Sequence, residues 1–345
     1  MNTIINSLGA EYGNTFINEF IRRLRVRLPT DTLLARDKDD KLIIVFPGIN
    51  QQKDYHRYRE LISTLFICDG LDQPPSEKRY VYTGNAGMVF GELTTQNTTR
   101  LLQEAWLTLK QAQKQGNGVV SLFSSAMRDL ELYTLRLHEH LSDAIQRQEF
   151  HLVLQPIIDR GDEARCNESE CLIRRHSEAL GDVPPDRFIP LAEETGLIIP
   201  LGKWIIEEAC RELAQMIVRG APETFVIYIN VSAIQLLQQD FAWHLMDSIR
   251  RNGLSNGNVC IEITERVRVN HAQRIGKRLR YLRRHGISVS LDDFGANFPC
   301  HSCLHSLPFD SIKIDLRLVN GYLSDEKAKS VMDSLIVLAR GFTCR

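Results

Sequence analysis

The strongest structural signal in this chain is the stretch of residues 289–295, VSLDDFG. An apolar strand here ends in two adjacent carboxylates, Asp292 and Asp293, and a glycine follows them. Because a strand points successive side chains to opposite faces, neighbouring aspartates can share a site only where the strand becomes a loop. Such a concentration of carboxylate oxygens suits hard divalent cations. The alternative interpretation is a solvated turn in which Asp292 caps a helix.

From residue 149 onward, apolar strands alternate with amphipathic helices, which predicts a mostly parallel sheet with crossover helices. In an α/β barrel, the carboxyl-terminal ends of the strands form the active face. Five predicted strands end in a polar residue, as a shared site requires: Glu170, Asn230, Glu262, Asp292 and Lys313. The predicted strands span residues 150–157, 169–174, 225–231, 259–264, 288–292 and 311–314, and the main helices span 198–218, 232–252, 271–284 and 325–339.

Composition limits the classes of partner. The chain has 345 residues, enough for two domains, and its 43% hydrophobic content is that of a soluble globular protein. A net charge of −1 favours neither a nucleic acid polymer nor an anionic membrane as partner. The sequence contains no apolar run near the roughly 20 residues of a membrane segment. We therefore predict a cytoplasmic protein.

The eight cysteines are scattered, and only Cys300 and Cys303 have CxxC spacing. The sequence offers no second pair or histidine cluster that would complete a zinc set. We interpret the cysteines as reduced thiols, which agrees with a cytoplasmic location. A redox role for Cys300 and Cys303 is the alternative.

The first 123 residues predict a smaller α/β domain, and residues 124–148 predict an amphipathic connecting helix between it and the domain of residues 149–345. In the small domain, helices are expected over 15–28, 55–66 and 99–114, and strands over 32–36, 42–46, 80–90 and 119–123.

Residues 33–47 of this small domain resemble a GGDEF domain, the diguanylate cyclase fold. Of its five signature positions only Asp40 matches, and Lys41 places a positive charge where the family has a carboxylate. The chain also begins too late to contain the family's first strand and its metal-binding aspartate. The resemblance therefore implies a degenerate and truncated GGDEF domain that is not an active diguanylate cyclase. A scaffold or regulatory role is expected, and GTP binding is the alternative. The five signature positions are Lys38, Asp39, Asp40, Lys41 and Leu42.

The larger half, from about residue 135 to 345, resembles an EAL domain, the cyclic di-GMP phosphodiesterase family. The fold class is then α/β, with the cyclase-like domain followed by an incomplete TIM-type (β/α) barrel. The matching motifs agree with the family in order and spacing. They are QPI at 155–157, ECLIR at 170–174, FIPLAE at 188–193, NVS at 230–232, EITE at 262–265, DDFG at 292–295 and KID at 313–315.

The resemblance implies a role for each matching residue. The expected reaction is hydrolysis of cyclic di-GMP to linear pGpG by a homodimer with two magnesium or manganese ions. Lys313 would hold the attacking water, Glu265 would brace the loop after Asp293, and Arg174 would pair with a substrate phosphate. Substrate would also contact Gln155, Leu172 and Pro190. The implied metal ligands are Glu170, Asn230, Glu262, Asp292 and Asp293.

The sequence also departs from the family pattern. Cys171 stands where the signature has alanine, and residues 295–299 (GANFP) replace a glycine-rich loop, which should restrict its motion. After residue 315 the family continues with two more strands that carry a glutamate ligand and a glutamine. We therefore expect a truncated product with weak or absent turnover. The alternatives are a partner that supplies the missing part, and a non-catalytic module that binds cyclic di-GMP or a protein.

Overall fold

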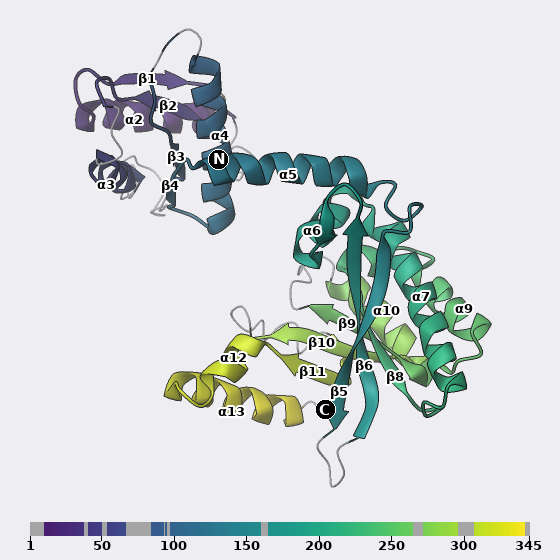
Figure 1. Cartoon of the computed structure of the whole chain (residues 1–345). Helices are drawn as coiled ribbons and strands as arrows, with labels where there is room; N and C mark the ends of the chain where they lie inside the picture. The colour runs from purple at the N-terminus through teal and green to yellow at the C-terminus, as the bar shows by residue number, and fades with distance from the viewer. Residues whose placement is uncertain are drawn as a thin grey trace. The chain divides into compact units, whose positions relative to one another are not determined.

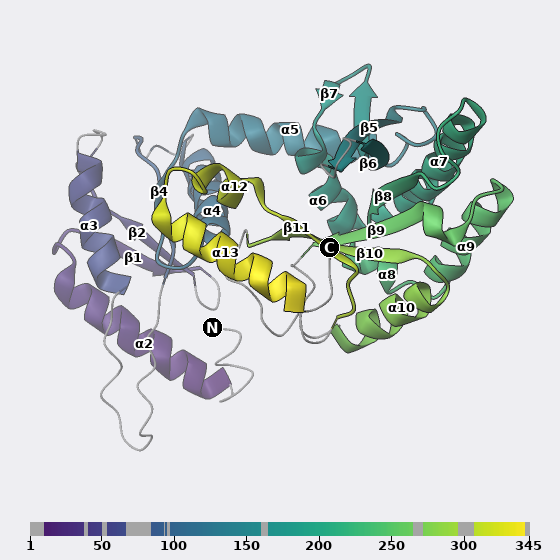
Figure 2. The ribbon, with the colours of Figure 1, turned by 90° about the horizontal axis from the view of Figure 1, so that it is seen from below.

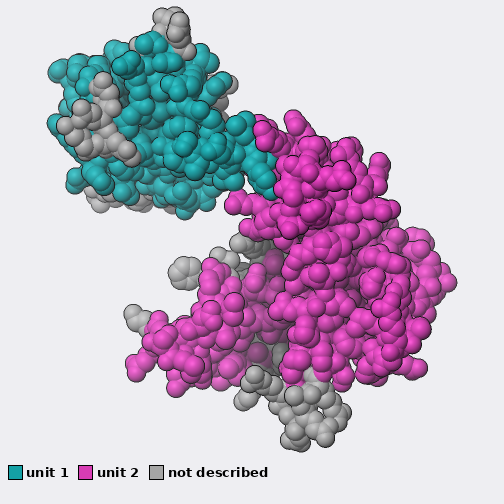
Figure 3. All heavy atoms as spheres, in the orientation of Figure 1, with its two compact units in different colours: residues 1–133 teal, residues 134–345 magenta. Residues whose placement is uncertain are grey.

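The computed structural model divides into two compact units, residues 1–133 and 134–345 (Figure 3). Helix α5 (Ser125–Leu141) crosses the boundary between the units. The domain boundaries predicted at residues 123 and 148 stay a prediction. The structure describes residues 10–37, 41–49, 54–66, 84–92, 94, 97–159, 165–264, 272–295 and 307–341.

The N-terminal unit has two small sheets in its described part, the antiparallel pair β1–β2 and the parallel pair β3–β4 (Figure 1). Gly87 on β3 allows α4 to approach closely, because an added Cβ would lie 2.3 Å from the backbone nitrogen of Leu109. The strand predicted over 80–90 is described only from residue 84 and is shorter. The elements are α2 (Ala10–Arg27), β1 (Leu33–Arg36), β2 (Leu42–Val45), α3 (Tyr55–Phe66), β3 (Ala86–Met88), α4 (Thr98–Gln115) and β4 (Val120–Leu122).

The C-terminal unit is organised around one seven-stranded sheet in the order β11-β10-β9-β8-β6-β5, with β7 paired to β6. Neighbouring strands from β6 to β11 are parallel, whereas β5 and β7 run antiparallel to β6. The predicted α/β class with a mostly parallel sheet is confirmed. The strands are β5 (Phe150–Asp159), β6 (Arg165–Ser177), β7 (Gly181–Val183), β8 (Val226–Asn230), β9 (Val259–Thr264), β10 (Ser288–Phe294) and β11 (Ser311–Ile314).

The two faces of this sheet differ in chemistry. Side chains of one parity are apolar and almost fully buried, as in Ile227, Ile261 and Val289, each 0% exposed. Helices α7 (Ile198–Val218), α9 (Phe241–Arg251) and α10 (Ala272–Arg284) lie on the outside of the curved sheet (Figure 2). Most side chains of the opposite parity are polar, whereas the interior of a TIM-type barrel is usually filled by branched apolar residues. These polar residues are Glu168, Glu170, Tyr228, Asn230, Cys260, Glu262, Ser288, Ser290, Asp292, Ser311 and Lys313.

The helix predicted over residues 232–252 is wrong, because the chain forms two helices there, α8 (Ala233–Leu236) and α9. Ser232 and Gln235 form a reciprocal capping box, with Ser232 N donating to Gln235 Oε1 at 2.9 Å and Gln235 N to Ser232 Oγ at 3.3 Å. The side chain of Gln235 also lies against Gly202 of α7, where a Cβ would fall 1.8 Å from Nε2. Tertiary packing thus stabilises α8 as a separate short helix, although the pattern of apolar residues predicts one continuous helix.

The connecting helix is shorter than predicted. Helix α5 ends at Leu141, and residues 142–148 form a turn in which Gln148 has a positive φ of 55°. The sequence also did not reveal β7, α6 (Pro185–Thr195) or α12 (Leu316–Gly321), whereas α13 (Glu326–Gly341) matches the last predicted helix. Proline at the start of α6 is favoured there, because the first helical amide needs no partner. None of the described helices has the length and hydrophobicity to cross a membrane.

Candidate functional site

The polar residues predicted at the strand ends meet around the ammonium group of Lys313. Its Nζ forms an ion pair with Glu170 Oε2, lies 2.8 Å from Glu262 Oε1 and lies 4.0 Å from Asp292 Oδ1. Asn230 Nδ2 donates a hydrogen bond of 2.8 Å to Glu170 Oε1. Five residues from five strands therefore form one cluster, called here the carboxylate cluster: Glu170, Asn230, Glu262, Asp292 and Lys313.

Strand order explains why residues so far apart in sequence come together. Lys313 and Glu170 are separated by 143 positions, but β11, β10, β9, β8 and β6 follow one another across the sheet. Asn230 is the register partner of Glu262, and all five side chains have the inward parity of their strands. Because these parallel strands run side by side in one direction, inward side chains at the same level of neighbouring strands come together.

Burial controls the electrostatics of the cluster. The side chain of Glu262 is 0% exposed, and this desolvation raises its pKa to about 8, although Lys313 lowers it. Burial also raises the pKa of Asp292, with a further contribution from Asp293. Burial alone would lower the pKa of Lys313, but the carboxylates of Glu262 and Glu170 outweigh it and raise that pKa. The cluster thus holds three acidic groups against one half-buried cation.

Asp293 has no ion pair or side-chain hydrogen bond with this cluster among the described residues. It is exposed, has a positive φ of 54° and precedes Gly295 with a φ of 90°. A left-handed conformation is uncommon outside glycine, although aspartate and asparagine adopt it more readily than other residues. The two adjacent aspartates at the end of β10 thus differ in exposure, since Asp292 is half-buried and Asp293 is exposed. The role of Asp293 toward a second ion stays a prediction.

The residues predicted to contact substrate differ in their positions. Gln155 on β5 is the register partner of Glu170, so its side chain lies beside the cluster. Leu172 and Arg174 continue along the face of β6 that carries Glu170, and Arg174 Nη1 donates to the carbonyl of Ile173 at 2.9 Å. Pro190 lies within α6, a helix that packs against β6. Their roles stay predictions.

Three predicted residues lie outside the described part of the chain. They are Glu265, the loop-bracing residue, and the CxxC pair Cys300 and Cys303. Residues 38–40 and 296–299, where the sequence departs from the two family patterns, also lie outside it.

A second polar layer beneath the cluster was not predicted. Tyr228, two residues before Asn230, donates a hydrogen bond of 3.0 Å to Glu168 Oε2, two residues before Glu170. Burial raises the pKa values of Tyr228 and Cys260, so both stay protonated. A period-2 count of polar residues along each strand would have found this layer, whereas attention to strand ends alone did not.

The carboxylate cluster has the chemistry of a divalent cation site. Glu262 Oε2 is buried and has no hydrogen-bond partner among the described residues, and the donor set is rich in oxygen. In the described part of the chain, however, no group of three or more His, Cys, Asp or Glu side chains is arranged to hold a metal ion. Lys313 lies between the carboxylates instead, and Asn230 presents its nitrogen to Glu170. Holding an ion requires Lys313 to withdraw and the Asn230 amide to rotate.

Comparisons with known proteins agree with this geometry. The EAL domain family matches residues 138–345, and the family described as diguanylate cyclase, GGDEF domain, matches residues 1–118. Among curated relatives, the chain is 30% identical to the oxygen sensor protein DosP of Escherichia coli over 96% of its own length. It is 29% identical to the cyclic di-GMP phosphodiesterase PA2567 of Pseudomonas aeruginosa over 98% of its length. It spans 41% of the first protein and 57% of the second.

Solved structures give the same result. The EAL enzyme Bd1971 in its cAMP-bound form superimposes with a TM-score of 0.56 at 31% identity, over 64% of this chain and 62% of that one. The PaMucR phosphodiesterase in complex with c-di-GMP gives a TM-score of 0.56 at 27% identity, over 61% and 84%. The chain belongs to the EAL domain family and carries a GGDEF domain before it.

Proposed function

We propose that the C-terminal unit hydrolyses cyclic di-GMP to linear pGpG. The observation that carries the proposal is the carboxylate cluster, in which three acids, one amide and one lysine from five neighbouring strands meet at one edge of an EAL-family sheet. A relative and a solved structure of the same family are named as phosphodiesterases. Water attacks one phosphorus, the phosphodiester bond to the departing ribose oxygen breaks, and that oxygen takes a proton.

Magnesium or manganese, when bound, would supply an activated water and neutralise charge that develops on the phosphate. Glu170, Asn230, Glu262 and Asp292 would hold one ion, and Asp293 would serve a second. The 0% exposure of Glu262 keeps bulk water from competing for its oxygens. Its unpartnered Oε2 supports the assignment, because a buried carboxylate oxygen without a donor is costly unless a cation satisfies it.

Lys313 is the residue that would orient the attacking water. Its ammonium is already held against Glu262 and Glu170, whose carboxylates raise its pKa. Once cations hold the carboxylates, the same three N–H donors can turn toward water or a phosphate oxygen. Gln155 and Arg174, on the two strands beside the cluster, would contact the substrate, with Arg174 pairing a phosphate.

The decisive experiment measures pGpG by chromatography after the full chain is incubated with cyclic di-GMP and manganese or magnesium. We expect Asp292→Asn to lower the rate at least about 100-fold, since even outer-shell partners of metal ligands cost about 10–100-fold. The matched control is Asp333→Asn, which removes an exposed aspartate from α13 and should leave the rate unchanged.

Two outcomes would overturn the proposal. Binding of cyclic di-GMP without pGpG in either metal would indicate a binding module. Equal rates in Asp292→Asn and the wild-type chain would place the chemistry elsewhere. A homodimer and a cytoplasmic location are further proposals from the family resemblance, and sedimentation velocity with and without cyclic di-GMP tests the first of these.

We also propose that the N-terminal unit does not synthesise cyclic di-GMP. Lys41 stands where the GGDEF signature has a carboxylate, and a lysine cannot ligate a magnesium ion that holds a triphosphate. Incubation of the full chain with GTP and magnesium should therefore give no cyclic di-GMP in a variant that cannot degrade it, such as Asp292→Asn.

A further inference from the structure

Helix α10 carries an unusual concentration of positive charge. Its 13 residues include no acidic side chain and six basic ones: Arg274, Lys277, Arg278, Arg280, Arg283 and Arg284. The buried face of the helix is apolar, with Ile275, Leu279 and Leu282 fully covered, so the basic groups lie on the remaining surface. Like charges at neighbouring helical positions repel one another and cost stability. Such a cost is offset when an anion binds.

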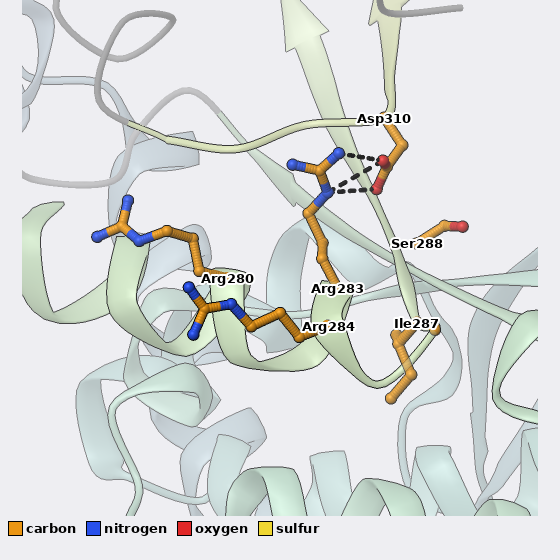
Figure 4. A pocket seen from close by; sticks show the side chains of 7 residues that line it. Arg280, Arg283, Arg284, Ile287, Ser288 and Asp310 are labelled. Carbon is orange, nitrogen blue, oxygen red and sulfur yellow. Dashed lines mark hydrogen bonds and ion pairs between the residues drawn. The ribbon is translucent and has the colours of Figure 1, made fainter.

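The last turn of α10 borders a hollow of about 390 Å³. Figure 4 shows how its lining side chains lie: the guanidinium group of Arg283 points to Asp310, whereas those of Arg280 and Arg284 point away from it. A hollow of this size falls within the range that holds small ligands, about 300–1,000 Å³. Its wall is completed by Gly286, Ile287 and Ser288 at the beginning of β10.

Arg283 is fixed in place before any ligand arrives. Its Nε donates to both carboxylate oxygens of Asp310 at 3.0 Å, and its Nη2 donates to Oδ1 at 2.6 Å. Asp310 Oδ2 also accepts a hydrogen bond of 2.9 Å from the backbone of Val289. The carboxylate thus ties the loop before β11 to β10 and to the helix. A guanidinium held this way keeps its outer N–H groups in a defined direction.

Arg280 and Arg284 also line the hollow, and no acidic side chain among the described residues neutralises their charge. Both are exposed, and among the described residues neither has a hydrogen bond or an ion pair. They are four positions apart, so they lie side by side on α10. Three arginines and one aspartate leave the hollow with a charge of +2, and arginine is the preferred residue for planar recognition of phosphate.

The hollow is distinct from the carboxylate cluster. Ser288 lines it at the first residue of β10, and Asp292 joins the cluster four residues later, roughly 13 Å along the strand. One anionic ligand cannot contact both without spanning the strand, and the cluster itself repels anions in the absence of metal. A ligand in the hollow therefore belongs to a second site.

We propose that this hollow binds an oligophosphate anion, a small molecule with two or more linked phosphate groups, between Arg280, Arg283 and Arg284. Small size follows from the volume of the hollow, and multiple phosphates follow from its charge. Inorganic tripolyphosphate and the phosphate chain of a nucleoside triphosphate share this chemistry.

The test is isothermal titration of the full chain with inorganic tripolyphosphate in EDTA at physiological ionic strength. The double variant Arg280→Gln/Arg284→Gln should bind at least about tenfold more weakly than wild type, the effect of losing two charge-assisted hydrogen bonds. The matched control, Arg274→Gln/Lys277→Gln, removes the same charge from the same helix outside the hollow and should change affinity less than threefold. Asp292→Asn should bind as the wild type does, which separates this site from the cluster.

Equal weakening in the two double variants would overturn the proposal in favour of nonspecific attraction to a basic helix. An absence of binding by the wild-type chain at millimolar tripolyphosphate would also overturn it, provided that thermal melting shows the chain to be folded. A parallel titration with ATP identifies the source of the ligand: equal affinity indicates the phosphate chain alone, and tighter binding of ATP indicates a nucleotide. None of these results depends on hydrolysis of cyclic di-GMP.

Discussion

The two units of this chain hold their strands in different ways. Strand β9 in the C-terminal unit lies between β8 and β10, and five of its six residues are buried. Strand β1 in the N-terminal unit pairs only with β2 among the described strands, and three of its four residues are exposed. Charged groups are placed more accurately on backbone that is fixed from both sides, because an edge strand keeps more freedom. Four of the five cluster residues lie on such strands, whereas Lys313 lies on β11, at the edge of the described sheet.

The two units should differ most in how much stability is lost when an ion pair is broken. Arg175 on β6 is 0% exposed, pairs with Glu149 at 2.9 Å and donates to the carbonyl of His140 at the end of α5. Arg175→Met should lower the free energy of unfolding by about 3–5 kcal/mol, because it leaves a buried carboxylate without its partner. Chemical unfolding followed by circular dichroism measures the loss.

The matched control comes from the other unit. Lys110 and Glu131 form an ion pair at the same 2.9 Å, but their side chains are 55% and 31% exposed. Lys110→Met should cost less than about 1 kcal/mol, since solvent screens an exposed pair. Similar losses in the two variants would show that the units do not differ in this respect.

A smaller effect is expected at the centre of the cluster. Lys313→Met removes the ammonium that lies among Glu170, Glu262 and Asp292 and should lower the free energy of unfolding in EDTA by about 2 kcal/mol. The value lies below that for Arg175 because Lys313 is 30% exposed and Glu262 can take up a proton. Manganese should restore most of the loss, because a cation can replace the ammonium.

Lys329→Met, which removes an exposed lysine from α13, serves as the control and should respond to neither EDTA nor manganese. If Lys313→Met is as stable as the wild-type chain in EDTA, repulsion among the three carboxylates does not lower the free energy of unfolding. A destabilised variant that manganese does not rescue would argue against a cation site at the cluster.

The smallest effect concerns pH and belongs to the C-terminal unit, since the described residues of the N-terminal unit include no cysteine. Burial raises the pKa of Cys210 from 9.0 to about 12. The unfolded thiol loses its proton first as pH rises through 9, so its contribution to stability falls between pH 9 and 12. At pH 10 the loss is about 1.4 kcal/mol relative to pH 7. The free energy of unfolding of wild type and Cys210→Ala, measured at both pH values, isolates the contribution of this thiol. Identical pH dependence of stability in the two chains would contradict the prediction.

The sequence predicted much of the fold because its elements have strong local signals. The predicted limits of α7 at 198 and 218 and of α3 at 55 and 66 agree with those in the structure. The split between α8 and α9 escaped this approach, because it depends on the side chain of Gln235 against Gly202, and periodicity carries no information on such contacts.

The site was predictable in its members but not in its arrangement. Polar residues at strand ends identified Glu170, Glu262 and Asp292, since the ends of parallel strands share one edge. That Lys313 lies between their carboxylates depends on which strands are neighbours and on a register irregularity between Leu291 and Phe294, and neither is encoded locally. The layer of Glu168 and Tyr228 lies one inward position before Glu170 and Asn230, and a prediction that takes one polar residue from each strand does not include it.

The left-handed backbone at Asp293 has a consequence for how this chain tolerates substitution. Asparagine and glycine can adopt a φ of 54° at little cost, whereas a β-branched residue there would be strained. Asparagine would therefore erase the carboxylate charge while the turn survives, and valine would disturb the path of the chain into Gly295 as well. At this position, natural variation that alternates among aspartate, asparagine and glycine would reveal selection on the shape of the backbone, separately from selection on charge.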